Sequence, residues 1–258
     1  MGTADRGADV ALNARLNWAS HRLHELYLGL DAFEESRPFT VQCRVDPRTT
    51  ERVYTVHDLE TPPPSLVFMA GDVVHHLCSL LDNIAWNLWE RAPDKSGIGE
   101  KTVSFPLTPR ALKKARDGWL SRVGPGAQEA VERFQPVAGE EVESDFLRHL
   151  EGLWSRDKHR APALALMNQT AASYPSSGPG EIKSKVPPRR PLREGDWILR
   201  LHVPDDAELI GDPIHELDLC YQDPPLTGNA VRIVLGEGLR FMRDEVIPVF
   251  APLLRGLP

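Results

Sequence analysis

Residues 71–91 read GDVVHHLCSLLDNIAWNLWER and form the longest strongly periodic run of the chain. At 100° per residue this run predicts a helix with one wide apolar arc, broad enough to pack against more than one neighbour. The apolar arc comprises Val73, Val74, Leu77, Cys78, Leu80, Leu81, Ile84, Ala85, Leu88 and Trp89. The remaining positions, which we call the polar strip, are Asp72, His75, His76, Ser79, Asp82, Asn83, Trp86 and Asn87.

The polar strip lacks the long charged side chains that usually cover an exposed helix face. It contains no Lys, Glu or Arg, and a tryptophan lies in the middle of it. This composition predicts a strip that is covered by another helix, by a second subunit or by a ligand. A buried hydrogen-bonded network that only stabilises helix packing would have the same composition, and both interpretations stay open at this point.

The bulk composition limits the class of protein. A chain of 258 residues can bury a full core and predicts a single domain spanning 1–258. The net charge of −7 argues against a nucleic-acid backbone as the main partner. Cys43, Cys78 and Cys220 form no CxxC pair, which predicts reduced thiols in a cytoplasmic protein.

Neither a targeting segment nor a membrane partner is expected. The start of the chain, residues 1–16, lacks a basic segment followed by an apolar run, so no signal peptide is predicted. No uncharged apolar stretch approaches the roughly 18 residues that a membrane span requires. We therefore expect 71–91 to be a core helix.

The remaining pattern predicts an α+β protein that is mostly helical, with an inserted N-terminal β-hairpin. Alternation over Phe39–Val45 and Arg52–His57, around the turn signal Asp46–Pro47, predicts the hairpin at 38–58. Strands at 181–186, 197–203 and 215–221 predict a small C-terminal antiparallel sheet, as a β-subdomain at 180–222. Helical periodicity predicts a core at about 9–35, 64–92, 109–168 and 227–250. Pro248 and Pro252 are expected to end the last helix.

A second polar cluster lies at residues 155–160, which read SRDKHR between Trp154 and an apolar run. Such a charge run is usually a solvated surface. At the edge of a core, however, Asp157 would be able to orient His159, and the cations would be able to hold an anion. The chain contains no GxGxxG, Walker, HExxH or GxSxG pattern. We therefore expect no cofactor and no dedicated metal site.

The central helix resembles that of a family of uncharacterised bacterial proteins. Their helix reads approximately Gly-Asp-x-Leu-His-Asn-Leu-Arg-Ser-Ala-Leu-Asp-His, followed by an aromatic residue. The matching positions here are Gly71, Asp72, His75, Leu77, Ser79, Leu81, Asp82 and Trp86. Three further blocks are similar and in the same order: Phe105-Pro106, Gln135-Pro136 and Asp157-Lys158-His159-Arg160.

The family pattern in turn resembles the HEPN superfamily of helical domains, which includes metal-independent RNases. These enzymes use an Arg followed four to six residues later by a His, usually paired across a dimer. The resemblance implies an antiparallel helical bundle in which the His assists proton transfer from a ribose 2′-OH and the Arg stabilises charge. At these two positions the chain has Cys78, which cannot supply a fixed cation, and Asn83, which cannot transfer a proton. The resemblance therefore implies a HEPN-like fold without RNase chemistry.

Three functions follow from these observations. The first is a HEPN-like binding protein without RNase activity, in a toxin–antitoxin or phage-defence context, with a homodimer through the central helix and a small-molecule or protein partner. The second is a hydrolase or metal-dependent enzyme with its site on the polar strip of 71–91 and the cluster Asp157–Arg160. The third is a purely structural polar core. Beside these three, a metal-independent RNase is a further alternative. The candidate catalytic residues are Asp72, His75, Asp82 and His159. The candidate binding residues are His76, Ser79, Asn83, Trp86, Asp157, Lys158 and Arg160.

Overall fold

The computed structural model describes residues 3–135, 145–159, 164–168, 174–213, 217–224 and 226–255. The fold is α+β, about 50% helical, with antiparallel strands. Where chain length had predicted one domain, the chain divides into two compact units. We call residues 1–26, 68–161 and 233–258 the helical unit, and residues 27–67 and 162–232 the strand unit.

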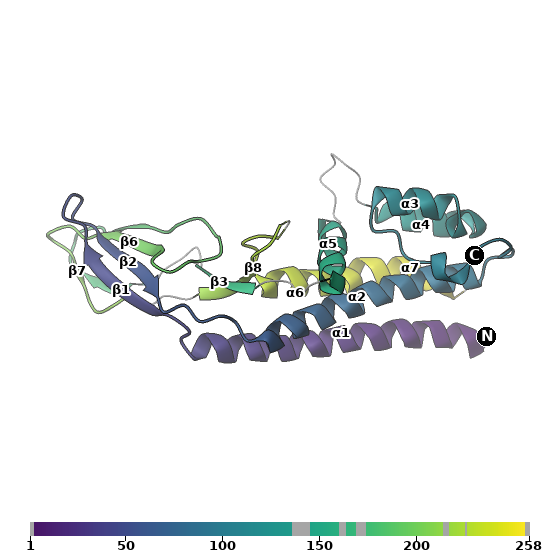
Figure 1. Cartoon of the computed structure of the whole chain (residues 1–258), viewed down its shortest axis with the longest axis horizontal. Helices are drawn as coiled ribbons and strands as arrows, with labels where there is room; N and C mark the ends of the chain where they lie inside the picture. Colours follow the sequence, from purple (N-terminus) through teal and green to yellow (C-terminus); the bar gives the residue numbers. More distant parts are fainter. Residues whose placement is uncertain are drawn as a thin grey trace. The chain divides into compact units, whose positions relative to one another are not determined.

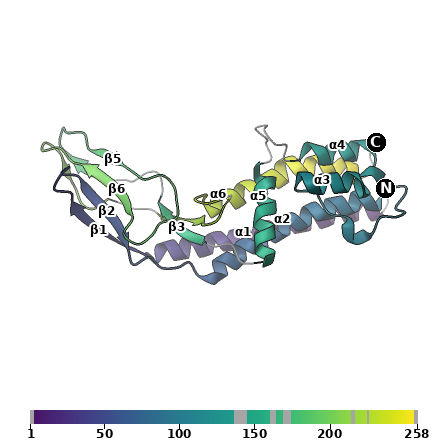
Figure 2. The same ribbon diagram turned by 45° about the horizontal axis from the view of Figure 1, so that its top comes forward.

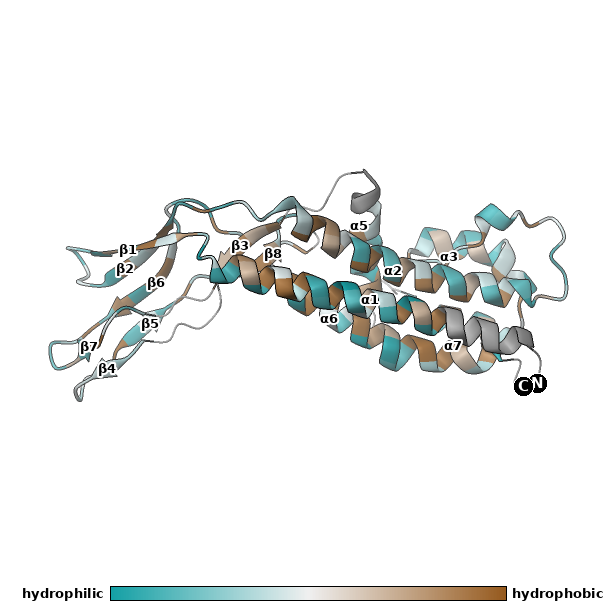
Figure 3. Cartoon of the chain, turned by 90° about the horizontal axis from the view of Figure 1, so that it is seen from below, coloured by the Kyte–Doolittle hydropathy of each residue, from teal (hydrophilic) through white to brown (hydrophobic). Residues whose placement is uncertain are grey.

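Two long helices dominate the first part of the chain, α1 (Thr3–Glu35) and α2 (Pro64–Glu90). They lie side by side within the helical unit (Figures 1 and 2). Every residue of the predicted apolar arc of α2 is at most 5% exposed, so the helical projection is confirmed. Hydrophilic and hydrophobic residues alternate along α1 (Figure 3), as expected for an amphipathic helix with one buried face.

The shorter helices differ from the predicted helical core in two places. They are α3 (Pro109–Arg116), α4 (Pro125–Arg133), α5 (Asp145–His159), α6 (Val231–Phe241) and α7 (Ile247–Leu254), with short 3₁₀ turns at Glu100–Thr102 and Trp119–Arg122. Within the predicted helical core at 109–168, α3 ends at Arg116, and Gly118 then adopts ψ −120°, where an added Cβ would lie 3.1 Å from the Lys114 carbonyl oxygen. Residues 164–168 of that predicted core form a strand instead of a helix.

The expectation that Pro248 ends the last helix is wrong. A π-helical segment, Met242–Val246, follows α6, and α7 then continues to Leu254. Pro248 lies in the first turn of α7, where a missing backbone N–H leaves no intrahelical hydrogen bond unmade. The wider π turn thus lets the chain remain helical through a proline.

In the strand unit the predicted hairpin is confirmed, but it is not separate from the C-terminal strands. β1 (Thr40–Val45) pairs antiparallel with β2 (Arg52–His57), and β2 pairs on its other side with β6 (Trp197–His202). With β5 (Lys183–Lys185) they form one sheet of order β1-β2-β6-β5. Residues 53–56 of β2 are all buried, which suits a central strand rather than the outer strand of an isolated hairpin.

Two smaller sheets complete the strand unit. β3 (Leu164–Asn168) pairs with β8 (Leu217–Tyr221), with Leu166 opposite Leu219. The predicted strand at 215–221 therefore joins β3 rather than the four-stranded sheet. β4 (Ser176–Ser177) pairs with β7 (Glu208–Leu209).

One arginine in the strand unit is surrounded by three carboxylates. Arg232 Nη2 lies 2.7 Å from Asp31 Oδ1 and 3.2 Å from Glu34 Oε2, and its Nε lies 3.8 Å from Asp218 Oδ1. Tyr27 Oη donates a hydrogen bond to the Arg232 carbonyl oxygen at 2.8 Å. Burial raises the pKa of Glu34 to about 7 and also raises the pKa of Asp218. The cluster therefore holds a proton near neutral pH.

By length and composition, α2 alone among the helices of the described residues would be able to cross a membrane. Half of its most apolar window is buried inside the protein, as happens in the core helix of a soluble protein. A single helix of this kind is a weak indication of a membrane span, and the absence of a membrane partner stays a prediction.

Candidate functional site

The polar strip of α2 is half open rather than sealed by the rest of the chain. His75 and Asp82 are exposed, and the other members of the strip are partly exposed. Among the described residues, contacts from α1 reach Asp72 and His76, Trp154 of α5 lies against His75, and Arg15 of α1 lies beside Ser79 and Asn83. Helices of the same chain therefore cover part of the strip, and a second subunit or a ligand stays open as the cover of the rest.

At the first end of the strip, Asp72 takes part in an ion-pair chain with α1. Arg22 Nε lies 3.5 Å from Asp72 Oδ2, and Arg22 Nη1 donates to Glu25 Oε2 at 2.6 Å. Hydrogen bonding to Arg22 lowers the pKa of Glu25 below its ordinary value. The contacts of Asp72 are thus those of a surface ion pair and not those of a catalytic base held by a histidine.

The two histidines of the strip lie against different tryptophans. The His76 ring stacks on Trp18 at a centroid distance of 6.5 Å, and the His75 ring lies 5.1 Å from the Trp154 ring of α5, which crosses α2 in Figure 2. Burial lowers the pKa of His76, and the neighbouring His75 lowers it further. The neutral form of His76 is therefore favoured, and its buried Nδ1 has no hydrogen-bond partner among the described residues.

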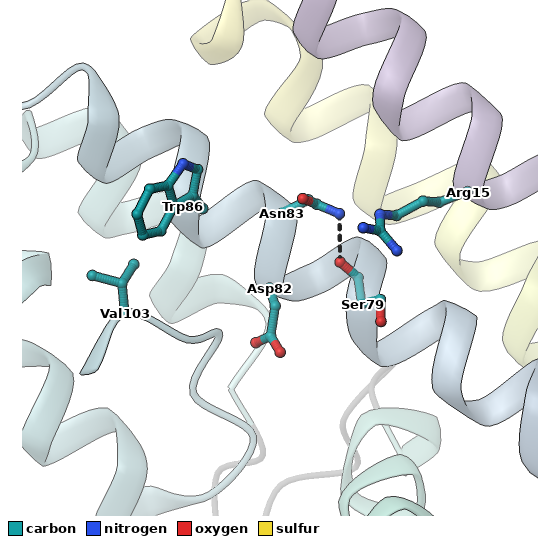
Figure 4. A pocket seen from close by; sticks show the side chains of 6 residues that line it. All are labelled: Arg15, Ser79, Asp82, Asn83, Trp86 and Val103. Carbon is teal, nitrogen blue, oxygen red and sulfur yellow. Dashed lines mark hydrogen bonds between the residues drawn. The ribbon is translucent and has the colours of Figure 1, made fainter. Parts of the chain in front are cut away.

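The other end of the strip lines a pocket of about 250 Å³. Its lining residues are Arg15, Ser79, Asp82, Asn83, Trp86 and Val103 (Figure 4). Asn83 Nδ2 donates to the Ser79 carbonyl oxygen at 2.8 Å, so the amide is held in one orientation. The Trp86 ring is held at 4.9 Å from the ring of Trp89. Four predicted site residues, Ser79, Asp82, Asn83 and Trp86, thus come together around one hollow.

Asp82 connects α2 to the Phe105-Pro106 block. The Phe105 backbone N–H donates to Asp82 Oδ1 at 2.9 Å, and the buried Phe105 ring packs on Phe250. Asp72 and Asp82 are ten residues apart, which is about 15 Å along a helix at 1.5 Å per residue. The two carboxylates that were predicted to share a catalytic site therefore lie in separate environments.

We expect Asp82→Ala to lower the free energy of unfolding by about 1 kcal/mol, because the Phe105 N–H loses its acceptor. Asp82→Asn retains an acceptor oxygen at the same position and should lose less than half of that amount. Urea denaturation followed by circular dichroism measures both values. Equal losses in the two variants would show that the charge of Asp82, rather than its acceptor oxygen, is what matters.

The second polar cluster cannot be placed against the strip. Helix α5 extends through His159, so part of the cluster is helical. The side chains of Asp157, Lys158 and His159, and the whole of Arg160, lie outside the described residues. Whether the cluster faces Asp72, His75 and Asp82 stays a prediction.

The described residues contain no group of three or more His, Cys, Asp and Glu side chains that could hold a metal ion. The two positions that HEPN RNases use also differ in environment. Cys78 is 3% exposed within the apolar arc, and the Asn83 amide donates its hydrogen bond to a helix carbonyl. Cys78 is therefore buried away from the pocket, whereas Asn83 lines it.

Arg15, like Val103, is a pocket residue that the sequence did not reveal. It lies on α1, within an ordinary amphipathic pattern, and only the packing of α1 along α2 brings it to Ser79 and Asn83 (Figure 4). No local motif distinguishes it from the other arginines of α1. The site is defined by its geometry alone, because no protein-family model matches the chain, and no curated protein and no solved structure matches it either.

Proposed function

We propose that the protein is a HEPN-like helical binding protein without RNase activity, and that the pocket on the polar strip of α2 is its ligand site. The observation that carries this proposal is the pocket itself. It brings Arg15 of α1 and Trp86 of α2 together at the polar strip of α2, which itself has no long charged side chain. Convergent polar groups that fix the orientation of a ligand are a feature of ligand sites, and Arg15, Ser79 and Asn83 are such groups beside the apolar surface of Trp86 and Val103.

The lining of the pocket favours binding over catalysis. A nucleophile needs a neighbouring base within hydrogen-bond reach, and no histidine lines the pocket among the described residues. Asp82 is the one carboxylate there, and its Oδ1 already accepts the Phe105 N–H. Among the lining residues, Ser79 therefore has no histidine that would activate its hydroxyl.

The absence of RNase activity has a direct test. Purified protein should leave single-stranded and structured RNA intact in buffer with EDTA, because Cys78 carries no fixed charge and Asn83 cannot transfer a proton. The positive control is a metal-independent ribonuclease assayed on the same RNA in the same buffer. Cleavage by the unmodified protein that survives EDTA would contradict the proposal.

The ligand site is tested by ligand-observed NMR with a fragment library. Fragments that bind the unmodified protein should lose binding in Ser79→Phe, since the larger side chain fills the pocket. Ser20→Phe, at an exposed position of α1, is the matched control and should bind the same fragments. If the two variants retain the same fragments, or if no fragment binds the unmodified protein, the pocket is not the ligand site.

The same proposal includes a homodimer that forms through α2. It also places the protein in the cytoplasm, in a toxin–antitoxin or phage-defence system. Trp18 and Phe68 expose 57% and 63% of their surface in the helical unit, and a second copy would cover them. Light scattering after size exclusion should give a dimer that Phe68→Glu converts to a monomer. A monomer before substitution would remove the dimer from the proposal.

A further inference from the structure

Arg15 and Arg22 are both partly buried on α1, but among the described residues only Arg22 has carboxylate partners. Glu25 and Asp72 lie 2.6 Å and 3.5 Å from its guanidinium. No described carboxylate forms an ion pair with Arg15, which reaches from α1 toward Asn83 and Ser79 (Figure 4). A guanidinium stays charged at every accessible pH and offers a planar fork of donors. Arg15 is therefore suited to hold an anionic group inside the pocket.

The second feature is a flat apolar wall. Trp86 is partly exposed into the pocket, and its ring is held against the ring of Trp89 at an interplanar angle of 59°. Val103 lies on the same side of the pocket as Trp86 (Figure 4). Aromatic rings are favoured partners for an indole face, because stacking adds to the burial of apolar area.

The third feature is the volume of the pocket together with the charge of its lining residues. An apolar cavity of about 150 Å³ accepts benzene, so a pocket of about 250 Å³ has room for a bicyclic ring with one small substituent. Arg15 is the only cation among the lining residues. A second negative charge on a ligand would lack a counter-ion and would cost desolvation energy.

From these three features we infer that the ligand is a small, flat aromatic molecule with a single anionic group. Its ring lies on Trp86 and Val103, and its carboxylate, or an equivalent anionic group, lies on the Arg15 guanidinium. This inference rests on the proposed ligand site and specifies the chemical class of its occupant.

Isothermal titration calorimetry with naphthalene-2-carboxylate as the probe tests the class. The probe should bind with a stoichiometry of one, whereas naphthalene-2-carboxamide, which has the same ring without the charge, should bind about 10-fold to 100-fold more weakly. Acetate, which has the charge without the ring, should not bind measurably. Arg15→Met should weaken the carboxylate to the level of the amide and leave the amide unchanged.

Two further variants keep the result interpretable. Arg22→Met removes a neighbouring arginine outside the pocket lining and should bind the probe as the unmodified protein does. Arg15→Lys retains the charge without the planar fork and should bind with intermediate affinity. Circular dichroism melts of the variants confirm that each one is folded.

The outcomes distinguish failure of the inferred ligand class from failure of the proposed ligand site. Equal affinity for the carboxylate and the amide, or no effect of Arg15→Met, overturns the inferred class. If the probe does not bind while fragments still depend on position 79, the class is wrong and the ligand site stands. If fragments are also insensitive to Ser79→Phe, the proposed function fails as well.

Discussion

Replacing Phe250 by alanine should lower the free energy of unfolding by about 3–5 kcal/mol, the range measured for buried aromatic residues. Phe250 is 0% exposed, and its ring lies 5.9 Å from that of Phe105 and 5.8 Å from that of Phe134. Alanine would remove the apolar area and leave a cavity between these rings. Because Phe105 is also hydrogen-bonded to Asp82, the loss should extend to the pocket and weaken probe binding.

Chemical denaturation in urea measures this loss, and an exposed apolar residue provides the control. Leu28 is 56% exposed on α1, so Leu28→Ala should change the free energy of unfolding by less than about 0.5 kcal/mol. Phe250→Leu keeps most of the buried area and should fall between the two. Similar values for Phe250→Ala and Leu28→Ala would show that the aromatic cluster does not contribute to stability.

Replacing Arg232 by methionine should destabilise the protein by about 2–4 kcal/mol at pH 8. The substitution leaves three carboxylates without their shared cation. Removing one partner of a fully buried pair costs about 3–5 kcal/mol, and the partial exposure of these side chains reduces that figure. At pH 5 the loss should be smaller, because Glu34 is then protonated and needs no counter-ion.

The pH dependence of Glu34 has a defined sign in the unmodified protein. Burial raises its pKa to about 7, so the folded state keeps a proton that the unfolded chain releases near pH 4.5. Protonated Glu34 therefore makes its full contribution to the stability of the folded state below pH 4.5. This stabilisation is lost as the pH rises through about 7. Glu34→Gln, which cannot titrate, should lack this loss.

The measurement compares unfolding free energies of the unmodified protein and Glu34→Gln between pH 4.5 and pH 8. The difference between the two curves should change by about 2 kcal/mol across this window, with the unmodified protein losing stability relative to the variant. Taking the difference removes the contribution of carboxylates whose pKa is lowered, such as Asp196. Parallel curves would show that Glu34 is ionised throughout and that its proton has no role.

Much of the local structure was predictable because it depends on spacing alone. A helix rotates by a constant angle per residue, so the apolar positions of 71–91 identified the buried face of α2 before any contact was known. The β1–β2 hairpin followed from alternation on either side of Asp46–Pro47, which is also a local signal. The continuation of α7 through Pro248 was not predictable, since it depends on a π turn that the neighbouring core stabilises.

Pairing between distant strands was not predictable either. β2 joins β6, and β8 joins β3, through backbone hydrogen bonds that are the same for every residue type. The side chains of β2 indicate a buried strand but do not indicate which strand lies beside it. The hairpin and the C-terminal strands therefore looked like separate elements in the sequence.

The sequence by itself determined that α2 has a face without long charged side chains, and it identified Ser79, Asp82, Asn83 and Trp86 on that face. Only the tertiary structure decided that the face is half open and that Arg15 completes a pocket on it. The physical reason is that the position of a side chain on a helix depends on local geometry. The neighbour of that face depends on the burial of apolar area over the whole core, to which residues far apart in the sequence contribute together.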